Sequence, residues 1–256
     1  QDGRDFKGHF DGQGHRIQNL TTNAELNNQA LFGQAVGGAI IENVIIDASC
    51  TMVGNACAAG ILGHVWGDGV IVRNCGNEAD INGTAQNAAG IIACSEKEVH
   101  IENCYNLGTI TGSHENAGIC AWMGSNKSTI KNCYSTGLVN DGAGLYRHNS
   151  VQGENLYQMD GDQGIAFTEA QLKSGELAYL LNGKQSDNVS WYQVIGTEDH
   201  PVPFGTAVVY ANGNLECDGI TPVAGGTISY SNTPGGNVAA HTWNDWGFCD
   251  KCGGLN

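Results

Sequence analysis

One short phrase recurs about every 29 residues in the first part of the chain. It joins strand-like residues to a fixed asparagine, and a second phrase of the Ala-Gly-Ile type alternates with it. Strand-like pieces at such a period, without helical ones between them, are typical of a β-solenoid. We therefore predict an all-β fold for residues 1–152, a right-handed parallel β-helix of about five coils, its handedness following the rule for parallel crossovers. The fixed asparagines are Asn19, Asn43, Asn74, Asn103 and Asn132.

Alignment of the copies separates buried from exposed positions. The residues two before and one after the asparagine are apolar or cysteine, so both belong in the core, with stacked asparagine amides at a bend between them. The residue before the asparagine is polar and belongs outside. Parallel strands about 4.8 Å apart would place Glu42 beside Arg73 and Arg73 beside Glu102, as pairs of opposite charge. The two core columns are Ile17, Ile41, Val72, Ile101 and Ile130, and Leu20, Val44, Cys75, Cys104 and Cys133.

Ten cysteines raise the question of disulfides. Cys50, Cys75, Cys104 and Cys133 fall in core columns, where a thiol serves as a small buried hydrophobe. Stacked neighbours would come near disulfide distance, but side chains that run side by side give a poor dihedral angle for a bridge. We therefore favour free buried thiols over disulfides for these residues. The pattern does not place Cys57, Cys94 and Cys120.

Charge and composition exclude several classes of function. The formal net charge is −15 with only 11 Lys and Arg residues, which argues against nucleic acid and anionic membrane surfaces as partners. The charge is compatible with Ca²⁺ or with simple solubility, but Asp160 and Asp162 lack the rest of an EF-hand, so we expect a plain turn there. No apolar run is long enough to span a bilayer. Because the sequence begins without Met or a signal peptide, we expect a processed chain or part of a larger protein.

The string FKGHFDGQGHRIQNL at residues 6–20 resembles the opening of bacterial surface β-helix proteins with GLUG-type repeats. ALFG at Ala30–Gly33 and the later NCYN phrases are similar to the same group, particularly to proteins of gut Bacteroidetes and Firmicutes. The resemblance implies the β-helix architecture and a secreted or cell-surface location, and it carries over no catalytic residues. We interpret His9, Asp11 and His15 as parts of a tight turn rather than as a catalytic set.

The Ala-Gly-Ile phrase suggests a ligand-binding strip. If its column from Leu31 to Leu145 faces the core, the residues one and three positions later face out. Aromatic rings and histidines on such a strip could stack sugar rings, or the strip could pack against a loop, the C-terminal segment or a partner. The two outward columns are Phe32, Leu62, Ile92, Cys120 and Tyr146, and Gln34, His64, Cys94, Trp122 and His148, with Trp66 on the next turn.

The periodicity changes after residue 152. Residues 153–166 are expected to form a linker, and a single amphipathic helix of about 13 residues should follow, with Thr168 and Gln171 as a capping box and a stop at Gly183. An open β-helix end exposes core and strand edges, so we expect this helix to cap it. The segment that follows the helix predicts two strands around a proline-containing turn, which completes a region of residues 153–212.

Residues 213–256 contain four residues with the chemistry of a structural zinc site. A Cys-x-x-Cys-Gly knuckle at Cys249 and Cys252 follows an upstream Cys217 and His241. Thiolate sulfur and imidazole nitrogen are the usual ligands of tetrahedral structural Zn²⁺, and a tail this short needs such a staple. The alternative is a disulfide, between Cys249 and Cys252 or between Cys217 and Cys249.

Every well-aligned column has a structural explanation, so we expect a non-catalytic, secreted or cell-surface β-helix module for adhesion, glycan binding or spacing, with carbohydrate or other surface proteins as partners. The alternative is a carbohydrate-active enzyme, a polysaccharide lyase or glycoside hydrolase, which would need paired carboxylates on adjacent rungs. Its candidate residues are Glu96, Glu98, Glu102 and Glu115.

Overall fold

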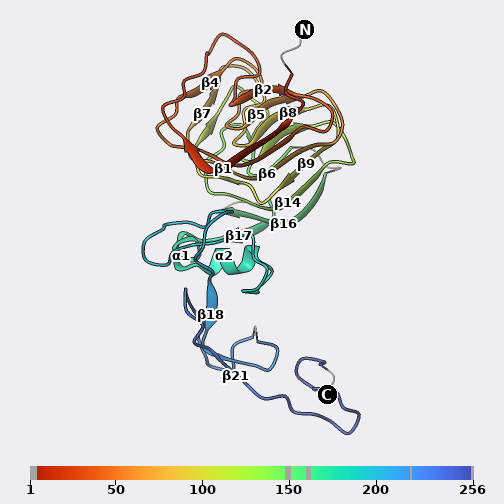
Figure 1. Ribbon diagram of the computed structural model, residues 1–256, viewed down its shortest axis with the longest axis vertical. Helices are drawn as coiled ribbons and strands as arrows, with labels where there is room; N and C mark the ends of the chain where they lie inside the picture. The colour runs from red at the N-terminus through yellow and green to blue at the C-terminus, as the bar shows by residue number, and fades with distance from the viewer. Residues whose placement is uncertain (1–4, 148–150, 160–162, 220, 255–256) are drawn as a thin grey trace. The chain divides into compact units, whose positions relative to one another are not determined.

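The computed structural model describes residues 5–147, 151–159, 163–219 and 221–254. The chain divides into two compact units, residues 1–168 and residues 169–256, and each is described by itself (Figure 1). Within the described part, no helix is long and apolar enough to cross a membrane.

The first unit is a parallel β-solenoid of about five coils, which confirms the predicted β-helix. Its strands stack in three main sheets, and every pair within them is parallel (Figure 1). The largest sheet contains β1 (His9–Ile17), β3 (Ile40–Ile46), β6 (Val70–Asn77), β9 (Val99–Glu102), β10 (Tyr105–Asn106), β14 (Thr129–Ser135), β16 (Gln152–Met159) and β17 (Ile165–Phe167). The second contains β4 (Met52–Gly54), β7 (Ile81–Gly83) and β11 (Ile110–Thr111). The third contains β2 (Phe32–Ala35), β5 (Leu62–Val65), β8 (Ile92–Ser95) and β13 (Cys120–Met123), and a short pair joins β12 (Asn116–Ala117) to β15 (Gly142–Ala143).

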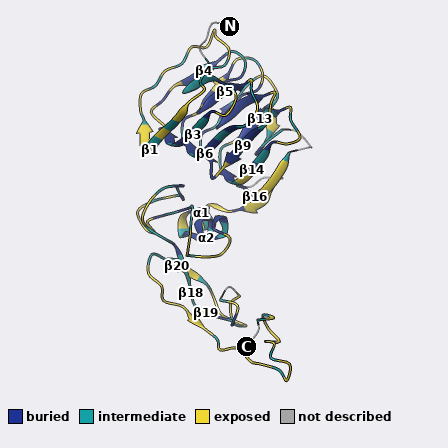
Figure 2. Ribbon diagram, turned by 45° about the vertical axis from the view of Figure 1, so that its right-hand side comes forward, coloured by how far each residue is buried: buried dark blue, intermediate teal, exposed yellow. Residues whose placement is uncertain are grey.

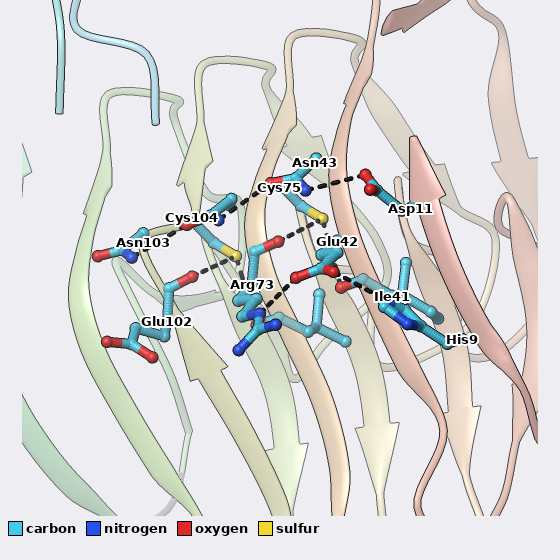
Figure 3. Close-up of polar contacts among 12 residues, drawn as sticks. His9, Asp11, Ile41, Glu42, Asn43, Arg73, Cys75, Glu102, Asn103 and Cys104 are labelled. Atoms are coloured by element: carbon cyan, nitrogen blue, oxygen red, sulfur yellow. Dashed lines mark hydrogen bonds and ion pairs between the residues drawn. The ribbon is translucent and has the colours of Figure 1, made fainter. Parts of the chain in front are cut away.

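From the second copy on, the register of the largest sheet is the one that the repeats predict. The first copy is shifted, because Phe10 pairs with Ile41 and Ile17 pairs with Ile46. The predicted alignment of Ile17, Asn19 and Leu20 with Ile41, Asn43 and Val44 was therefore wrong. Ile41 pairs with Val72, Val72 with Ile101 and Ile101 with Ile130. These residues are fully buried in one continuous core, and Figure 2 shows how burial concentrates on the central strands. The outer column is in register as well, and Arg73 Nε lies 2.5 Å from Glu42 Oε2 (Figure 3). The charged column therefore fixes the alignment of the rungs from outside while the aliphatic column fills the inside.

A ladder of asparagine amides marks the bend between these columns. Each fixed asparagine has a positive φ between 51° and 58°, a conformation that asparagine tolerates better than most residues. From Asn74 on, the side-chain amide of each copy donates to the amide oxygen of the copy before it at 2.9–3.2 Å. At the N-terminal end Asn43 donates to Asp11, which also accepts the Gln13 backbone N–H (Figure 3). Asp11 is thus part of a tight turn, as the sequence indicates.

A second polar ladder lies inside the solenoid, and the repeats do not reveal it. Asn77 and Asn106 are fully buried, and Asn77 Nδ2 donates to Asn106 Oδ1 at 2.8 Å. Glycines of the Ala-Gly-Ile phrase make room for these side chains, since a Cβ on Gly60 would lie 2.6 Å from Asn77 Oδ1. This packing explains why glycine occupies that position without a positive φ.

The solenoid extends beyond the boundary expected at residue 152. Residues 153–166 do not form a linker, because β16 pairs along β14 and β17 pairs along β16. Asn155 has φ 52° and donates to Asn132 Oδ1 at 2.9 Å, so it is a further copy of the asparagine ladder. The first compact unit accordingly ends at Thr168. The Asp160–Asp162 turn lies outside the described residues.

The four cysteines of the predicted core columns are buried free thiols, as expected. Cys120, which lies outside those columns, is a fifth buried thiol in the same core. Cys57 and Cys94 form a disulfide on the outer side of the third sheet. The free-thiol expectation is therefore confirmed for the core columns, which the disulfide does not involve.

We expect the core thiols to resist labelling by a maleimide in the native protein and to react fully in denaturant. Burial raises the pKa of the Cys75 and Cys104 thiols well above the ordinary value, so the reactive thiolate is scarce as well as inaccessible. Mass spectrometry of labelled peptides checks this. Rapid native labelling of the peptides carrying Cys75, Cys104 or Cys133 would contradict the observed register.

The second unit is built around two short helices, α1 (Glu169–Ser174) and α2 (Glu176–Leu181), instead of the single helix expected. Gly175 separates them with φ 89°, a left-handed value that interrupts the helix, and a Cβ there would overlap Ile195. Gln171 donates to Glu176 at 3.0 Å across this break.

Asn182, at the end of α2, organises the segment that follows. Its side chain accepts the Trp191 backbone N–H at 2.9 Å and donates to the Trp191 carbonyl at 2.8 Å, which fixes the fully buried Trp191. In place of the two expected strands, the next residues form one antiparallel bridge between Tyr192 and Val202. The remaining strands are β18 (Tyr210–Asn212) antiparallel to β20 (Ser229–Ser231), and β19 (Asn214–Leu215) parallel to β21 (Asn237–Val238).

Candidate metal centre and ligand surfaces

The structure brings the four predicted metal ligands together. One donor atom from each of Cys217, His241, Cys249 and Cys252 lies within 4.8 Å of all the others. Cys217 Sγ is 3.3 Å from Cys249 Sγ, and Cys252 Sγ is 3.3 Å from His241 Nδ1. Residues separated by up to 35 positions therefore meet at one point, which we call the C-terminal Cys/His cluster.

Backbone contacts in the Cys-x-x-Cys knuckle hold this cluster in place. The Cys249 N–H donates to the Gly254 carbonyl at 2.9 Å, and the Gly253 N–H donates to the Cys249 carbonyl at 2.8 Å. Gly253 has φ 71°, which the knuckle needs to turn back. Cys217 enters from the loop after β19, where Lys251 Nζ bonds to the adjacent Glu216 at 2.7 Å. An ion pair next to the ligands thus connects the knuckle to the loop after β19.

The electrostatics of the cluster favour a bound cation. Hydrogen bonding from His241 and from the Cys252 backbone lowers the pKa of the Cys249 thiol to about 5. The hydrogen bond to the Cys249 sulfur raises the pKa of the Cys217 thiol to about 12, and burial and repulsion between neighbouring thiolates act in the same direction. A divalent cation between the sulfurs would remove that repulsion. All three cysteines are free, so neither of the alternative disulfides is formed.

An exposed aromatic loop connects two ligands of the cluster. Trp243, Trp246 and Phe248 are 37%, 84% and 46% exposed and lie between His241 and Cys249. We call residues 242–248 the aromatic loop. The sequence pattern drew attention to the metal ligands of this segment and not to its three aromatic residues, although these fall within six positions.

Asn244 fixes the conformation of the aromatic loop. Its side-chain oxygen accepts the backbone N–H groups of Trp246 at 3.0 Å and Phe248 at 3.1 Å, and its side-chain nitrogen donates to Asp250 at 2.7 Å. The His241 ring stacks on Trp243 with centroids 4.6 Å apart. A metal held by His241 and Cys249 would therefore anchor both ends of the loop.

The predicted strip on the third sheet differs in part from the expectation. The column containing Leu62 and Ile92 does not face out but is buried in the main core, so that assignment was wrong. The reason is a bend: the N–H groups of Ile91 and Ile92 both donate to the Ile119 carbonyl, at 3.2 Å and 3.0 Å. Two consecutive residues then share one partner and strict alternation is lost. The misassigned residues are Phe32, Leu62, Ile92, Cys120 and Tyr146.

The column of His64 and Trp122 does lie outside the main core, but it is largely covered. His64 is buried and stacks on Trp66 with ring centroids 3.9 Å apart, and its burial lowers its pKa. Trp66 remains 37% exposed. Arg147 covers the Trp122 ring at 5.5 Å. His148 lies outside the described residues. Of the three predicted ligand-binding residues that the structure describes, Trp66 is the one that offers an exposed ring.

Two of the four carboxylates named for the enzyme alternative contact basic side chains on the surface. Glu98 lies 3.1 Å from His100, and Glu115 lies 3.0 Å from Arg147. Glu102 stands in register between Arg73 and Lys131 in the outer charged column. Within the described ranges, these glutamates do not join any group of three or more His, Cys, Asp or Glu side chains with donor atoms within 4.8 Å. Glu96 is exposed just after β8.

No protein-family model, curated protein or solved structure matches this chain. The resemblance to bacterial GLUG-type surface proteins therefore stays a prediction from the sequence. Function has to be inferred from the geometry of the sites themselves.

Proposed function

We propose that this chain is a non-catalytic module of a secreted or cell-surface bacterial protein that binds glycans through a zinc-stapled aromatic loop. The observation that carries the proposal is the exposure of Trp243, Trp246 and Phe248 on a loop that joins two ligands of the C-terminal Cys/His cluster. Aromatic faces offer flat apolar area with polar edges, which suits the apolar faces of sugar rings. The solenoid serves as a rigid support and spacer.

Zinc is the metal that best fits the donor set. Three thiols and one imidazole form a Cys₃His set, which is among the usual tetrahedral structural zinc sites. Such a set fills all four positions and leaves none for substrate, so the metal would act as a staple and not as a catalyst. Calcium prefers six to eight oxygen ligands, which this cluster does not offer.

A neutral or hydroxyl-rich glycan fits the charge of the chain better than an acidic polysaccharide. The formal charge of −15 would repel a polyanion, and only 11 Lys and Arg residues are available to neutralise one. The ion pairs of Glu98 and Glu115 with basic partners leave the enzyme alternative without a specific supporting geometry.

The test is retention on a panel of plant, mucin and microbial polysaccharides, read also for released reducing or unsaturated ends. We expect retention without products, and we expect Trp246→Ala to weaken it at least tenfold, since a stacked aromatic ring contributes about 1–3 kcal/mol to binding a flat ligand face. Leu138→Ala is the matched control, because Leu138 is also an exposed apolar residue, at 79%, but lies on the solenoid.

Three outcomes would count against the proposal. Released products would establish the enzyme alternative and direct attention to Glu98, Glu102 and Glu115. Loss of retention in Trp66→Ala with none in Trp246→Ala would move the binding surface to the solenoid strip. Absence of retention on every glycan would leave the spacer or protein-binding role in its place.

A further inference from the structure

A second group of soft ligands lies on the solenoid, far in sequence from the C-terminal cluster. Cys57 precedes β5, His64 lies within β5, and Cys94 lies in the adjacent strand β8, directly opposite His64 in the register. One donor atom from each of the three lies within 4.8 Å of the other two. We call this group the solenoid Cys/His cluster. It is closed by the Cys57–Cys94 disulfide, with Cα atoms 5.8 Å apart.

The histidine of this cluster is buried without a partner. His64 is 8% exposed, and within the part of the chain that the structure describes its Nε2 atom makes no hydrogen bond. A buried polar nitrogen without a partner costs about 1–3 kcal/mol, so such groups usually have a specific reason. The stacking of His64 on Trp66 fixes the ring plane but does not satisfy the nitrogen. The His64 ring is therefore held in place with a nitrogen free to act as a ligand.

Cys57 is also unusual for its position in the coil. The equivalent bends of the neighbouring coils carry Asn28 and Asn87, with φ 57° and 63°, and Cys57 has φ 59°. Asparagine tolerates this left-handed conformation, whereas cysteine gains nothing from it. The strained backbone nevertheless turns the Cys57 sulfur toward Cys94, and strain of this kind often marks a functional group.

We propose that the solenoid Cys/His cluster is a redox-gated metal site, which binds Zn²⁺ through Cys57, His64 and Cys94 when the disulfide is reduced. Two thiolates and one imidazole select a soft or borderline cation, and three protein ligands leave the fourth tetrahedral position for water. The two cysteines pack with Ala59 and Ala93, and Ala30 and Trp122 pack against this group, which limits access of bulk water.

The exchange between the two states balances in atoms and electrons. An external dithiol attacks the Cys57–Cys94 disulfide, is itself oxidised to a disulfide, and leaves Cys57 and Cys94 each reduced to a thiol. Zn²⁺ then displaces one proton from each thiol, and His64 supplies a lone pair as neutral imidazole. Oxidation in the reverse direction expels the metal, because a disulfide sulfur is a poor ligand.

The experiment counts Zn²⁺ in the full chain after the C-terminal cluster has been removed by Cys217→Ser, Cys249→Ser and Cys252→Ser. The protein is stripped with a chelator and divided into an oxidised sample and one treated with a phosphine reductant, which is then removed under argon. We expect one equivalent of Zn²⁺ in the reduced sample and none in the oxidised one. The added change Cys94→Ser should abolish binding, and His64→Ala should weaken it at least tenfold.

Circular dichroism of both samples shows whether the solenoid stays folded on reduction. Should the triple variant fail to fold, the reduced native chain is compared with reduced Cys94→Ser, and the native chain should hold one equivalent more. Absence of zinc from a folded, reduced protein would overturn the proposal. So would binding that survives Cys94→Ser, or unfolding of the solenoid on reduction. Loss of zinc from the C-terminal cluster leaves these outcomes unchanged.

Discussion

Replacement of Cys249 by serine is expected to lower the bound zinc by one equivalent and to unfold the C-terminal loop. Cys249 is the most buried of the four ligands. It belongs to the knuckle, and its sulfur lies 3.3 Å from the Cys217 sulfur. Among the described residues from 213 on, the buried apolar ones are Leu215, Cys217 and Cys249, so metal coordination has to supply much of the stability of this part. Structural zinc supplies about 10–16 kcal/mol of apparent binding free energy in zinc-finger peptides at pH 7.

Metal analysis, limited proteolysis and tryptophan fluorescence measure this effect, and the solenoid should keep its β-sheet circular dichroism. Lys251→Ala is the matched control, because Lys251 lies between Cys249 and Cys252 but makes only an exposed ion pair with Glu216. Such a pair contributes about 0–1 kcal/mol. If Cys249→Ser kept its full zinc content, or if the lysine variant lost as much metal, the C-terminal Cys/His cluster would not be a zinc site.

Gly90→Ala should destabilise the solenoid by about 1–3 kcal/mol, the usual cost of overpacking a well-filled core. A Cβ on Gly90 would overlap Asn106 Oδ1 from the internal polar ladder and the Gly118 carbonyl oxygen from the next coil. Gly90 does not need a positive φ, so the loss would report the clash and not backbone strain. Thermal and urea unfolding followed by circular dichroism measure the change.

Gly124→Ala provides the comparison for this measurement. Gly124 also has no positive φ, but its nearest neighbour to an added Cβ is 3.4 Å away, an ordinary contact. We expect it to leave stability within about 0.5 kcal/mol of the native protein. Equal effects of the two substitutions would mean that the internal ladder is not tightly packed against the Ala-Gly-Ile phrase.

The parts of the fold that repeat could be predicted from the sequence. The column of Ile41, Val72, Ile101 and Ile130 shows a buried aliphatic residue at the same position of four repeats. Such a pattern rarely arises by chance, so it predicts which residues pair between neighbouring strands. The asparagine bend could be found for the same reason. The metal ligands could be found because Cys-x-x-Cys spacing is a local signal, which can be recognised without knowing how the rest of the chain folds.

Other features depend on geometry that a single position does not reveal. The bend at Ile91 and Ile92 breaks alternation through a shared carbonyl on another coil, which no local pattern shows. Gly175 interrupts the helix although the apolar stripe of the sequence continues past it. The break comes from the left-handed φ of Gly175 and from the close packing of Ile195 against it. The Cys57–Cys94 pairing spans 37 residues and joins two different columns. In each case the deciding contact comes from a distant part of the chain.

The candidate site shows the same division. The ligands of the C-terminal Cys/His cluster were identified one by one, whereas the aromatic loop between them was missed because its residues have no fixed spacing. Trp122 was expected on an open strip, and only the position of Arg147, one coil further on, shows that its ring is covered. Exposure is a property of the folded surface, so sequence patterns predict it poorly for single aromatic residues.

The asparagine ladder has a consequence for how long such a molecule can be. Each amide accepts from the coil after it and donates to the coil before it, so every interior coil presents identical connectors above and below. Nothing in this connection depends on how many coils precede or follow. Adding or removing one whole repeat preserves the pairing of the rest and changes the length of the solenoid by about 4.8 Å. The length of the solenoid can therefore change by whole repeats, and the contacts within the remaining coils stay the same.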